Sequence, residues 1–330
     1  MPGDASQPLL SVRRLQVDMR TEKGRFPVVR DLSFDLLPGE TVGIVGESGS
    51  GKTVTCLSLL RLIPSPPAVY RTGEVLLEGV DLWQLSEGEL QRVRGNRVAV
   101  IFQEALSALN PVMSVGEQVA EVLIYHRGLD RVAAEEAVVG LFRQVGISDP
   151  EKRLRQYPHQ LSGGLQQRVM IAMALAGQPR ILIADEPTTA LDVTIQVQIL
   201  ELLRELQQTL GMSLLFISHD LAVIAEICRR VLVMYAGQIV EGGPIEEIFR
   251  DPRHPYTRLL LNSIPDLQKP RGAFRPIPGQ IPSPERLPSG CPFHPRCPEA
   301  VSRCRTEAPP LISLSPHRTV RCWQRMPSQP

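Results

Sequence analysis

The run GESGSGKT at residues 46–53 constrains the fold of this chain more than any other segment. It follows apolar residues 42–45, which read as a short strand, and precedes residues 54–62, which read as a helix. Glycines at such a turn let successive backbone N–H groups face one phosphate, and the helix N-terminus adds partial positive charge. The pattern therefore predicts an α/β fold built around a nucleoside triphosphate site. The residues expected to line that site are Gly46, Glu47, Ser48, Gly49, Ser50, Gly51, Lys52, Thr53 and Val54.

Charged and hydroxyl side chains supply the expected chemistry. Lys52 brings a full positive charge to the phosphates, and the hydroxyl of Thr53 is suited to Mg²⁺. The segment RILIADE, residues 180–186, predicts a buried strand that ends in two carboxylates. Asp185 is placed to hold Mg²⁺ through water, and Glu186 to orient or deprotonate the attacking water. A buried strand with an acidic turn would also explain this segment, but the phosphate loop in the same chain favours the catalytic interpretation.

A second candidate anion site lies at LSGGLQQR, residues 161–168, which open an amphipathic helix. Ser162 is a suitable N-cap, and Gly163 and Gly164 leave backbone N–H groups uncovered at the helix start. A capped helix after a flexible turn would give the same pattern. A single chain has no need of two γ-phosphate sites, unless the second one serves a nucleotide bound to a neighbouring chain.

This ordered set of motifs resembles the nucleotide-binding subunit of ATP-binding cassette (ABC) transporters, whose signature is LSGG. The resemblance implies that Gln103 reaches Mg²⁺ and the attacking water. It also implies that Asp192 contacts an opposing subunit and that His219 is the switch histidine at the γ-phosphate. Each motif occurs once, so the resemblance implies a dimer in which Ser162, Gly163 and Gly164 act in trans.

The resemblance fixes the expected roles. The catalytic residues are expected to be Glu186, His219, Gln103 and Lys52, and the Mg²⁺ ligands Thr53, Gln103 and Asp185. The chain departs from the family at Leu165, where many members have glutamine, but the expected contacts come from the three residues before it. The family also places an aromatic residue before the phosphate loop to stack on adenine, and here Met19 and Phe26 are the candidates.

The alternation of segments predicts the architecture. Short alternating stretches in residues 9–45 and 73–78 predict antiparallel strands, and strands ending at Val45, Phe102, Asp185, Ile217 and Met234 predict a largely parallel sheet. Together with these segments, the resemblance implies a P-loop NTPase fold of the ABC type, with an antiparallel β subdomain, a helical insertion and a loop-rich, cysteine-containing C-terminal extension. The expected domains are 1–253, with a helical subdomain at about 105–178, and 254–330.

Composition marks the extension. The last 80 residues hold 12 of the 36 Lys and Arg but 5 of the 35 Asp and Glu, and they contain 17 of the 30 prolines. The first residues, MPGDASQPLL, lack the basic start and apolar run of a secretory signal, and no apolar run approaches the ~18 residues of a membrane span. A cytosolic setting is therefore expected, in which disulfides are rare.

Four cysteines lie in the last 40 residues: Cys291, Cys297, Cys304 and Cys322. Structural zinc sites use tighter cysteine pairs, and disulfides do not suit the compartment. An iron–sulfur cluster takes four thiolates, and the neighbouring arginines would offset its negative charge. Four unligated thiols in a loop would fit the spacing equally well, so the residues alone leave these alternatives open. Cys56 and Cys228 are expected to be ordinary core residues.

The tail narrows the resemblance. HPYT, residues 254–257, and the later GCPFHPRCP are similar to the C-terminal extension of the peptide/nickel importer branch, the oligopeptide and dipeptide type. The resemblance implies an ATP-hydrolysing importer subunit for short peptides and a [4Fe–4S] cluster on the four cysteines. The implied cofactors are ATP and Mg²⁺. The implied partners are a second ABC ATPase subunit, a paralogue rather than a second copy, two permeases and an extracytoplasmic solute-binding protein.

The expected location is peripheral, on the cytoplasmic face of the cell membrane. Import of nickel or another solute by the same branch, and export, are the alternatives within this enzyme class. A soluble ABC-type ATPase acting on nucleic acid or ribosomes is the alternative of another class. Such proteins usually carry two cassettes in one chain, and the basic tail has few aromatic residues, so no nucleic acid partner is expected.

Overall fold

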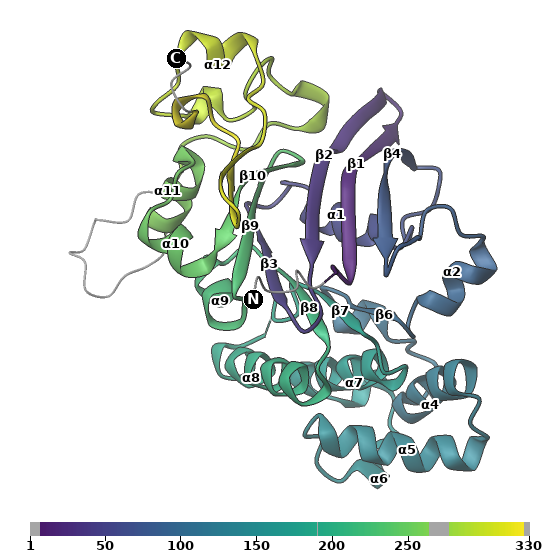
Figure 1. The fold of residues 1–330 in the computed structure, drawn as a ribbon. Helices are drawn as coiled ribbons and strands as arrows, with labels where there is room; N and C mark the ends of the chain where they lie inside the picture. The colour runs from purple at the N-terminus through teal and green to yellow at the C-terminus, as the bar shows by residue number, and fades with distance from the viewer. Residues whose placement is uncertain (1–6, 190, 264–276, 327–330) are drawn as a thin grey trace, which may run out of the picture. The chain divides into compact units, whose positions relative to one another are not determined.

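The computed structural model describes residues 7–189, 191–263 and 277–326. The chain divides into two compact units. Unit 1 comprises the residues up to Leu36, Thr41–Trp83 and the residues from Phe216 onward, and unit 2 comprises Leu37–Glu40 and Gln84–Leu215. Figure 1 labels the elements along the chain. Within the described residues, no helix is both long enough and apolar enough to span a membrane.

Unit 1 begins with an antiparallel sheet in the order β2-β1-β4-β5. Its strands are β1 (Leu10–Thr21), β2 (Gly24–Leu36), β4 (Ala68–Leu77) and β5 (Val80–Asp81). Val12, Leu15 and Val17 of β1 are fully buried. Leu15 and Val17 have the two-residue period of a sheet with one face on the core, and a register shift between Val12 and Leu15 accounts for the three-residue step before them. This sheet is the expected antiparallel subdomain.

The second group of strands in unit 1 positions the phosphate loop. β3 (Thr41–Val45) runs parallel to β9 (Arg230–Tyr235), and all five residues of β3 are buried. Helix α1 (Lys52–Leu59) follows β3 after the loop, and α9 (Leu221–Ile227) packs on β3. β9 continues antiparallel to β10 (Gln238–Pro244), after which α10 (Ile245–Arg250) and α11 (Pro255–Asn262) follow.

The C-terminal extension adds two strands to this sheet. β12 (Arg318–Val320) pairs with β10 and with β11 (Ile312–Ser315), so the order in unit 1 is β11-β12-β10-β9-β3. Figure 1 shows this segment in yellow against β10. The remaining elements are short: η2 (Pro284–Arg286), η3 (His294–Arg296), α12 (Ser302–Thr306) and η4 (Trp323–Arg325). The sequence predicts a loop-rich tail with one helix at 254–264, and α11 confirms that helix as far as the described residues reach.

Unit 2 contains the helical insertion. Its helices are α2 (Glu87–Val93), α3 (Ala105–Ala108), α4 (Val115–Arg127), α5 (Arg131–Gln144), α6 (Pro150–Arg153), η1 (Pro158–Gln160), α7 (Gly163–Ala176) and α8 (Val193–Leu210). The parallel strands β6 (Val98–Ile101) and β7 (Ile181–Asp185) pair with each other. β8 (Ser213–Ser218) begins in unit 2 and ends in unit 1. The expected strand ends agree with the observed ones to within one residue, and the expected P-loop α/β fold is confirmed.

Candidate nucleotide site

The phosphate loop has the backbone that its glycines predict. Gly49 and Gly51 have φ angles of 80° and 101°, a region that residues with a Cβ rarely adopt. A methyl group on Gly46 would overlap the carbonyl oxygen of Met234, so the loop lies against the end of β9 with no room for a side chain. The tip, at Ser48 and Gly49, is exposed to solvent. The loop therefore opens at the place where a phosphate would bind.

Lys52 is folded across the loop. Its side chain is buried, and its Nζ donates to the carbonyl oxygen of Gly46 at 2.8 Å and to that of Glu47 at 3.2 Å. Thr53 lies one residue further into the first turn of α1 and is half-buried. The ammonium group of Lys52 is thus held against the loop backbone next to the exposed tip, where its charge suits an anion.

Glu47 receives contacts from the C-terminal extension that the motif does not predict. Its backbone N–H donates to the hydroxyl of Tyr256 at 2.9 Å. Its carboxylate accepts from both terminal nitrogens of Arg296, at 2.7 and 2.9 Å. Sequence patterns missed Tyr256 and Arg296 as residues of the nucleotide site, although both lie within the HPYT and HPRC segments that carry the branch resemblance.

The two candidates for adenine stacking are cross-strand neighbours. Met19 on β1 is paired with Phe26 on β2, and both side chains are half-buried. The ring of Phe26 lies over Gly24, whose added Cβ would be 3.5 Å from the ring. The two alternatives therefore belong to one small apolar surface at the tip of this hairpin.

Unit 2 carries the acidic strand end. Asp185, the last residue of β7, is 2% exposed, and Glu186 follows with a φ of 46°. A residue with a side chain in this left-handed region costs of order 1–3 kcal/mol, and such strain clusters at functional sites. Glu186 Oε2 accepts from Thr189 Oγ1 at 3.0 Å and from Gln103 Nε2 at 3.3 Å. The structure thus brings two of the predicted catalytic side chains, Gln103 and Glu186, together.

The signature residues open α7 as predicted. Ser162 has the extended backbone of an N-cap, but among the described residues of α7 no backbone N–H group donates a capping hydrogen bond to its hydroxyl. Ser162 and Gly163 are exposed, and a Cβ on Gly164 would lie 2.9 Å from Ile195. Asp192 instead caps α8, because its carboxylate accepts from the N–H of Ile195 at 3.0 Å. The start of α7 therefore presents a hydroxyl and backbone N–H groups to solvent, and Asp192 is a helix cap in this chain.

His219 follows β8 directly and is exposed. The next residue, Asp220, begins α9, and its carboxylate accepts from the N–H of Ala222 at 2.8 Å. This capped turn fixes the backbone on one side of His219, and the buried strand β8 fixes it on the other.

Cys56 and Cys228 are buried in the core, as expected.

The four C-terminal cysteines gather in one region of the extension. The N–H of Cys291 donates to the carbonyl oxygen of Cys304 at 2.8 Å. Burial, and to a smaller extent the neighbouring thiols of the other three, raises the pKa of Cys291 to about 11; burial likewise raises that of Cys297 to about 11. No group of three or more His, Cys, Asp or Glu side chains among the described residues is placed to hold a metal ion. The cluster ligand set stays a prediction.

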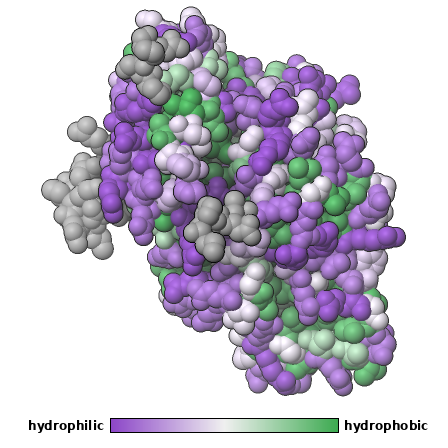
Figure 2. Space-filling model, in the orientation of Figure 1, coloured by the Kyte–Doolittle hydropathy of each residue, from purple (hydrophilic) through white to green (hydrophobic). Residues whose placement is uncertain are grey.

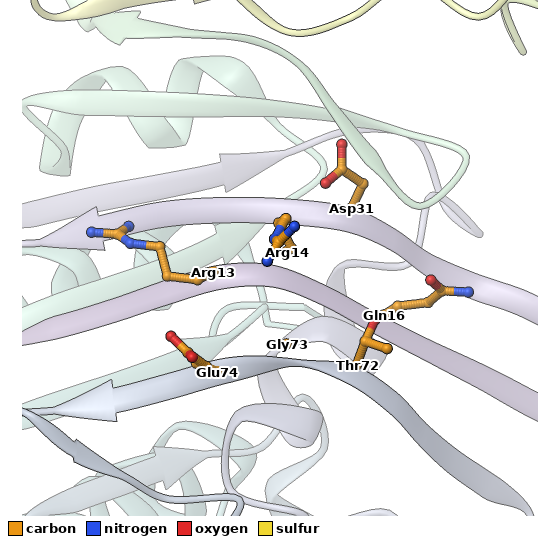
Figure 3. Close-up of a pocket in the computed structure, with 7 residues that line it drawn as sticks. All are labelled: Arg13, Arg14, Gln16, Asp31, Thr72, Gly73 and Glu74. Atoms are coloured by element: carbon orange, nitrogen blue, oxygen red, sulfur yellow. The ribbon is translucent and has the colours of Figure 1, made fainter.

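A separate hollow of about 430 Å³ lies on the antiparallel sheet of unit 1. Figure 3 shows Arg13 and Arg14 of β1 between Asp31 of β2 and Glu74 of β4. The hollow coincides with a register shift between β1 and β4, at which a Cβ on Gly73 would lie 2.7 Å from Leu15. Its shape follows from this bulge, and its lining mixes both signs of charge, so it is unlike the phosphate loop.

Comparison with known proteins identifies two regions. The pattern of the ABC transporter family matches residues 29–189, and that of the oligopeptide/dipeptide transporter C-terminal region matches residues 240–304. A Brucella ovis protein is 50% identical over 97% of this chain and 98% of its own length. A Brucella melitensis protein is 50% identical over 98% and 96%. The names of both assign them, provisionally, to peptide import with ATP binding.

Solved structures agree on the fold. A dimeric ATP-binding cassette, described in a post-hydrolysis state with ADP and Pi, is 26% identical, with a TM-score of 0.64 over 72% of this chain and 98% of its own. The cbiO1 structure of Clostridium perfringens is 24% identical, with a TM-score of 0.61 over 74% of this chain and 92% of its own, and it supports the fold alone. The chain therefore belongs to the ABC transporter family, as an ATP-hydrolysing subunit that carries the C-terminal region of oligopeptide and dipeptide transporters.

Proposed function

We propose that this chain hydrolyses ATP to energise the import of short peptides. The observation that carries the proposal is the joint match to the ABC family and to the oligopeptide/dipeptide C-terminal region, together with 50% identity to relatives named for peptide import. Import of nickel or another solute by the same branch is the alternative, because the ATPase subunit itself does not recognise the transported solute.

We infer the following roles for the site residues. Glu186 takes the proton of the attacking water while the water oxygen bonds to the γ-phosphorus and the bond to ADP breaks. Lys52, Gln103 and His219 stabilise the charge on the transferring group. Thr53, Gln103 and Asp185 would hold Mg²⁺, which neutralises phosphate charge when it is bound. The hydrogen bond from Gln103 to Glu186 supports a shared role for these two side chains.

The proposed assembly pairs this chain with a second ATPase subunit, a paralogue, so that Ser162, Gly163 and Gly164 complete the partner's site. Asp192 would lie at that contact, next to the helix that it caps. A solved relative is described as a dimeric cassette, which supports the pairing. Among the described residues of α7, no backbone N–H group donates a capping hydrogen bond to the hydroxyl of Ser162. This suits a hydroxyl that binds a phosphate of the partner's nucleotide.

A groove in unit 2 supports docking of a permease. It has a volume of about 1060 Å³ and lies along α4, α5 and the turn before α4. Its lining includes the exposed apolar side chains Val112, Ile124 and Tyr157 between the charges of Glu121 and Arg155. Figure 2 shows green apolar surface over this part of unit 2, at the lower right. A cytoplasmic helix of a permease fits such a groove, and the chain would then act at the cytoplasmic face of the membrane.

We further propose that Cys291, Cys297, Cys304 and Cys322 bind a [4Fe–4S] cluster. The backbone hydrogen bond from Cys291 to Cys304 supports this, because it brings two of the four segments together. Measurement of iron and labile sulfide after anaerobic purification tests the idea. About four irons and four sulfides per chain are expected; stoichiometric zinc, or iron below half of that, would refute it.

Uptake by cells tests the proposed function itself. Labelled di- and tripeptides, with nickel in parallel, are supplied to cells with and without this chain. We expect peptide uptake to be lost on deletion and restored by the wild type but not by Glu186→Gln. Loss of nickel uptake alone would identify nickel, and not peptide, as the transported solute. No change in the uptake of peptide or of nickel would overturn the proposal.

A further inference from the structure

We propose that Arg296 and Tyr256 are positioning residues for ATP: through Glu47, the C-terminal extension sets the affinity of the phosphate loop. The proposal rests on the nucleotide site described above and does not depend on which solute is transported. All three residues belong to unit 1.

Arg296 is anchored on both sides. Its two terminal nitrogens bind the two carboxylate oxygens of Glu47, and its Nε donates to the carbonyl oxygen of Pro278 at 2.8 Å. The side chain is 5% exposed, whereas that of Glu47 is 28% exposed. Such a two-pronged pair between a fixed guanidinium and a carboxylate sets direction as well as distance, and lysine cannot reproduce it.

Tyr256 holds the backbone of the same residue. Its hydroxyl accepts from the N–H of Glu47, and its ring is fully buried. The ring packs edge-on against Tyr235, with centroids 4.7 Å apart, and contacts Phe293 at 5.4 Å. Since aromatic packing fixes the ring, the hydroxyl has a fixed place. Glu47 is therefore held at both its backbone and its side chain by the extension.

Glu47 in turn shapes the loop. Its carbonyl oxygen accepts from Lys52 Nζ at 3.2 Å and from the N–H of Ser50 at 3.1 Å. A shift of Glu47 would move the acceptors that hold the catalytic lysine and the turn at the exposed tip. The extension also reaches that tip, because a Cβ on Gly49 would lie 3.4 Å from Ile281.

The position of Arg296 joins this contact to the cysteine region. Arg296 ends the short helix η3 and immediately precedes Cys297, and Phe293 of the aromatic cluster lies between Cys291 and η3. The segment that bears the thiols is therefore the same one that holds Glu47. A purely structural pair would instead fasten the extension to the core without altering ATP binding.

Binding of Mg-ATP to the full-length chain is measured by calorimetry for Arg296→Gln, Arg296→Lys and Tyr256→Phe. Loss of the two-pronged charge-assisted pair, which neither glutamine nor lysine can form, should weaken binding on the order of 10-fold in both arginine variants, and loss of the neutral bond about 3-fold in Tyr256→Phe. The matched control is Arg303→Gln, an exposed arginine of the same extension that pairs with Glu307. It should leave the affinity within about 2-fold.

Steady-state hydrolysis by the assembled transporter gives the second readout. We expect KM for ATP to rise in the arginine variants with little change in kcat, and Glu47→Gln combined with Arg296→Gln to be no worse than either alone. A lower melting temperature with unchanged Kd and KM would overturn the proposal. If Arg296→Gln does not fold, Tyr256→Phe, which keeps the aromatic packing, decides by the same criteria.

Discussion

Glu186 is the residue on which the proposed hydrolysis mechanism depends. Replacing it with glutamine keeps the size and the hydrogen bonds from Thr189 and Gln103 but removes the group that accepts a proton. We expect phosphate release to fall about 10²- to 10⁴-fold while ATP still binds, so that the ATP-bound pair of subunits accumulates. Steady-state phosphate release and size-exclusion chromatography with Mg-ATP measure both effects. An unchanged rate would remove Glu186 from the mechanism.

Gly46 shows how tightly the loop is packed. Gly46→Ala places a methyl group on the carbonyl oxygen of Met234, and backbone cannot give way as a flexible side chain can. We expect a loss of about 1–3 kcal/mol in the free energy of unfolding and weaker ATP binding. Gly140→Ala is the matched control, because the added methyl would meet no described atom and a helix gains about 1 kcal/mol from the change. Urea unfolding of both variants measures the difference, and equal effects would contradict this account.

At the scale of the element, α11 depends on a neutral histidine. His254 begins this helix, and its Nδ1 accepts from the N–H of Tyr256 at 3.0 Å. Burial, aided by the charges of Arg258 and Arg325, lowers the pKa of His254 to about 3. The unfolded chain takes up a proton near pH 6.5, so the stability that His254 contributes is present above that pH and is lost as the pH falls toward 3.

The variant His254→Asn keeps a capping side chain and removes the titration. We expect the unfolding free energy of the wild type to fall between pH 6.5 and 4.5 more steeply than that of His254→Asn, by up to about 1.4 kcal/mol per pH unit. Urea unfolding at several pH values gives the two slopes. Parallel slopes would show that His254 is not kept neutral by the fold.

The groove along α4 and α5 is the element expected to couple hydrolysis to transport. Val112 lines it and is 79% exposed, so Val112→Asp should leave folding intact and disfavour an apolar partner. Peptide uptake should fall several-fold while ATP binding by the isolated chain is unchanged. Val132→Asp, at a 70% exposed position of α5 that does not line the groove, is the control. Equal uptake in the two variants would exclude docking at this groove.

Elements differ in how far the sequence predicts them. The turn at Gly51, the strand end at Asp185 and the start of α7 at Gly163 are predictable because their chemistry depends on neighbours in the chain. The strands β11 and β12 were missed, since Ile312–Ser315 is mostly exposed and pairs with the neighbouring β12, and β12 in turn joins the sheet by pairing with β10, far away in the chain. The bond between Glu47 and Arg296 joins residues 249 positions apart, and no local pattern encodes it.

On the scale of the whole molecule, the chain combines an ATPase with an extension that the sheet incorporates. β12 pairs with β10, and buried Arg318 binds buried Glu241, so the extension is part of the core of unit 1. Composition marks the extension from residue 251 onward, but it does not show that these residues contact the phosphate loop. The contacts of Arg296 and Tyr256 with Glu47 join the branch-specific extension to the loop that the whole family uses to bind ATP.

Transport in proteoliposomes tests the central claim most directly. This chain, its paired ATPase and the two permeases are reconstituted with the solute-binding protein, and labelled tripeptide accumulation and phosphate release are followed in the same vesicles. We predict that ATP drives accumulation, that peptide raises the hydrolysis rate, and that Glu186→Gln abolishes both. Hydrolysis that peptide does not stimulate, with no accumulation of peptide, would contradict the account.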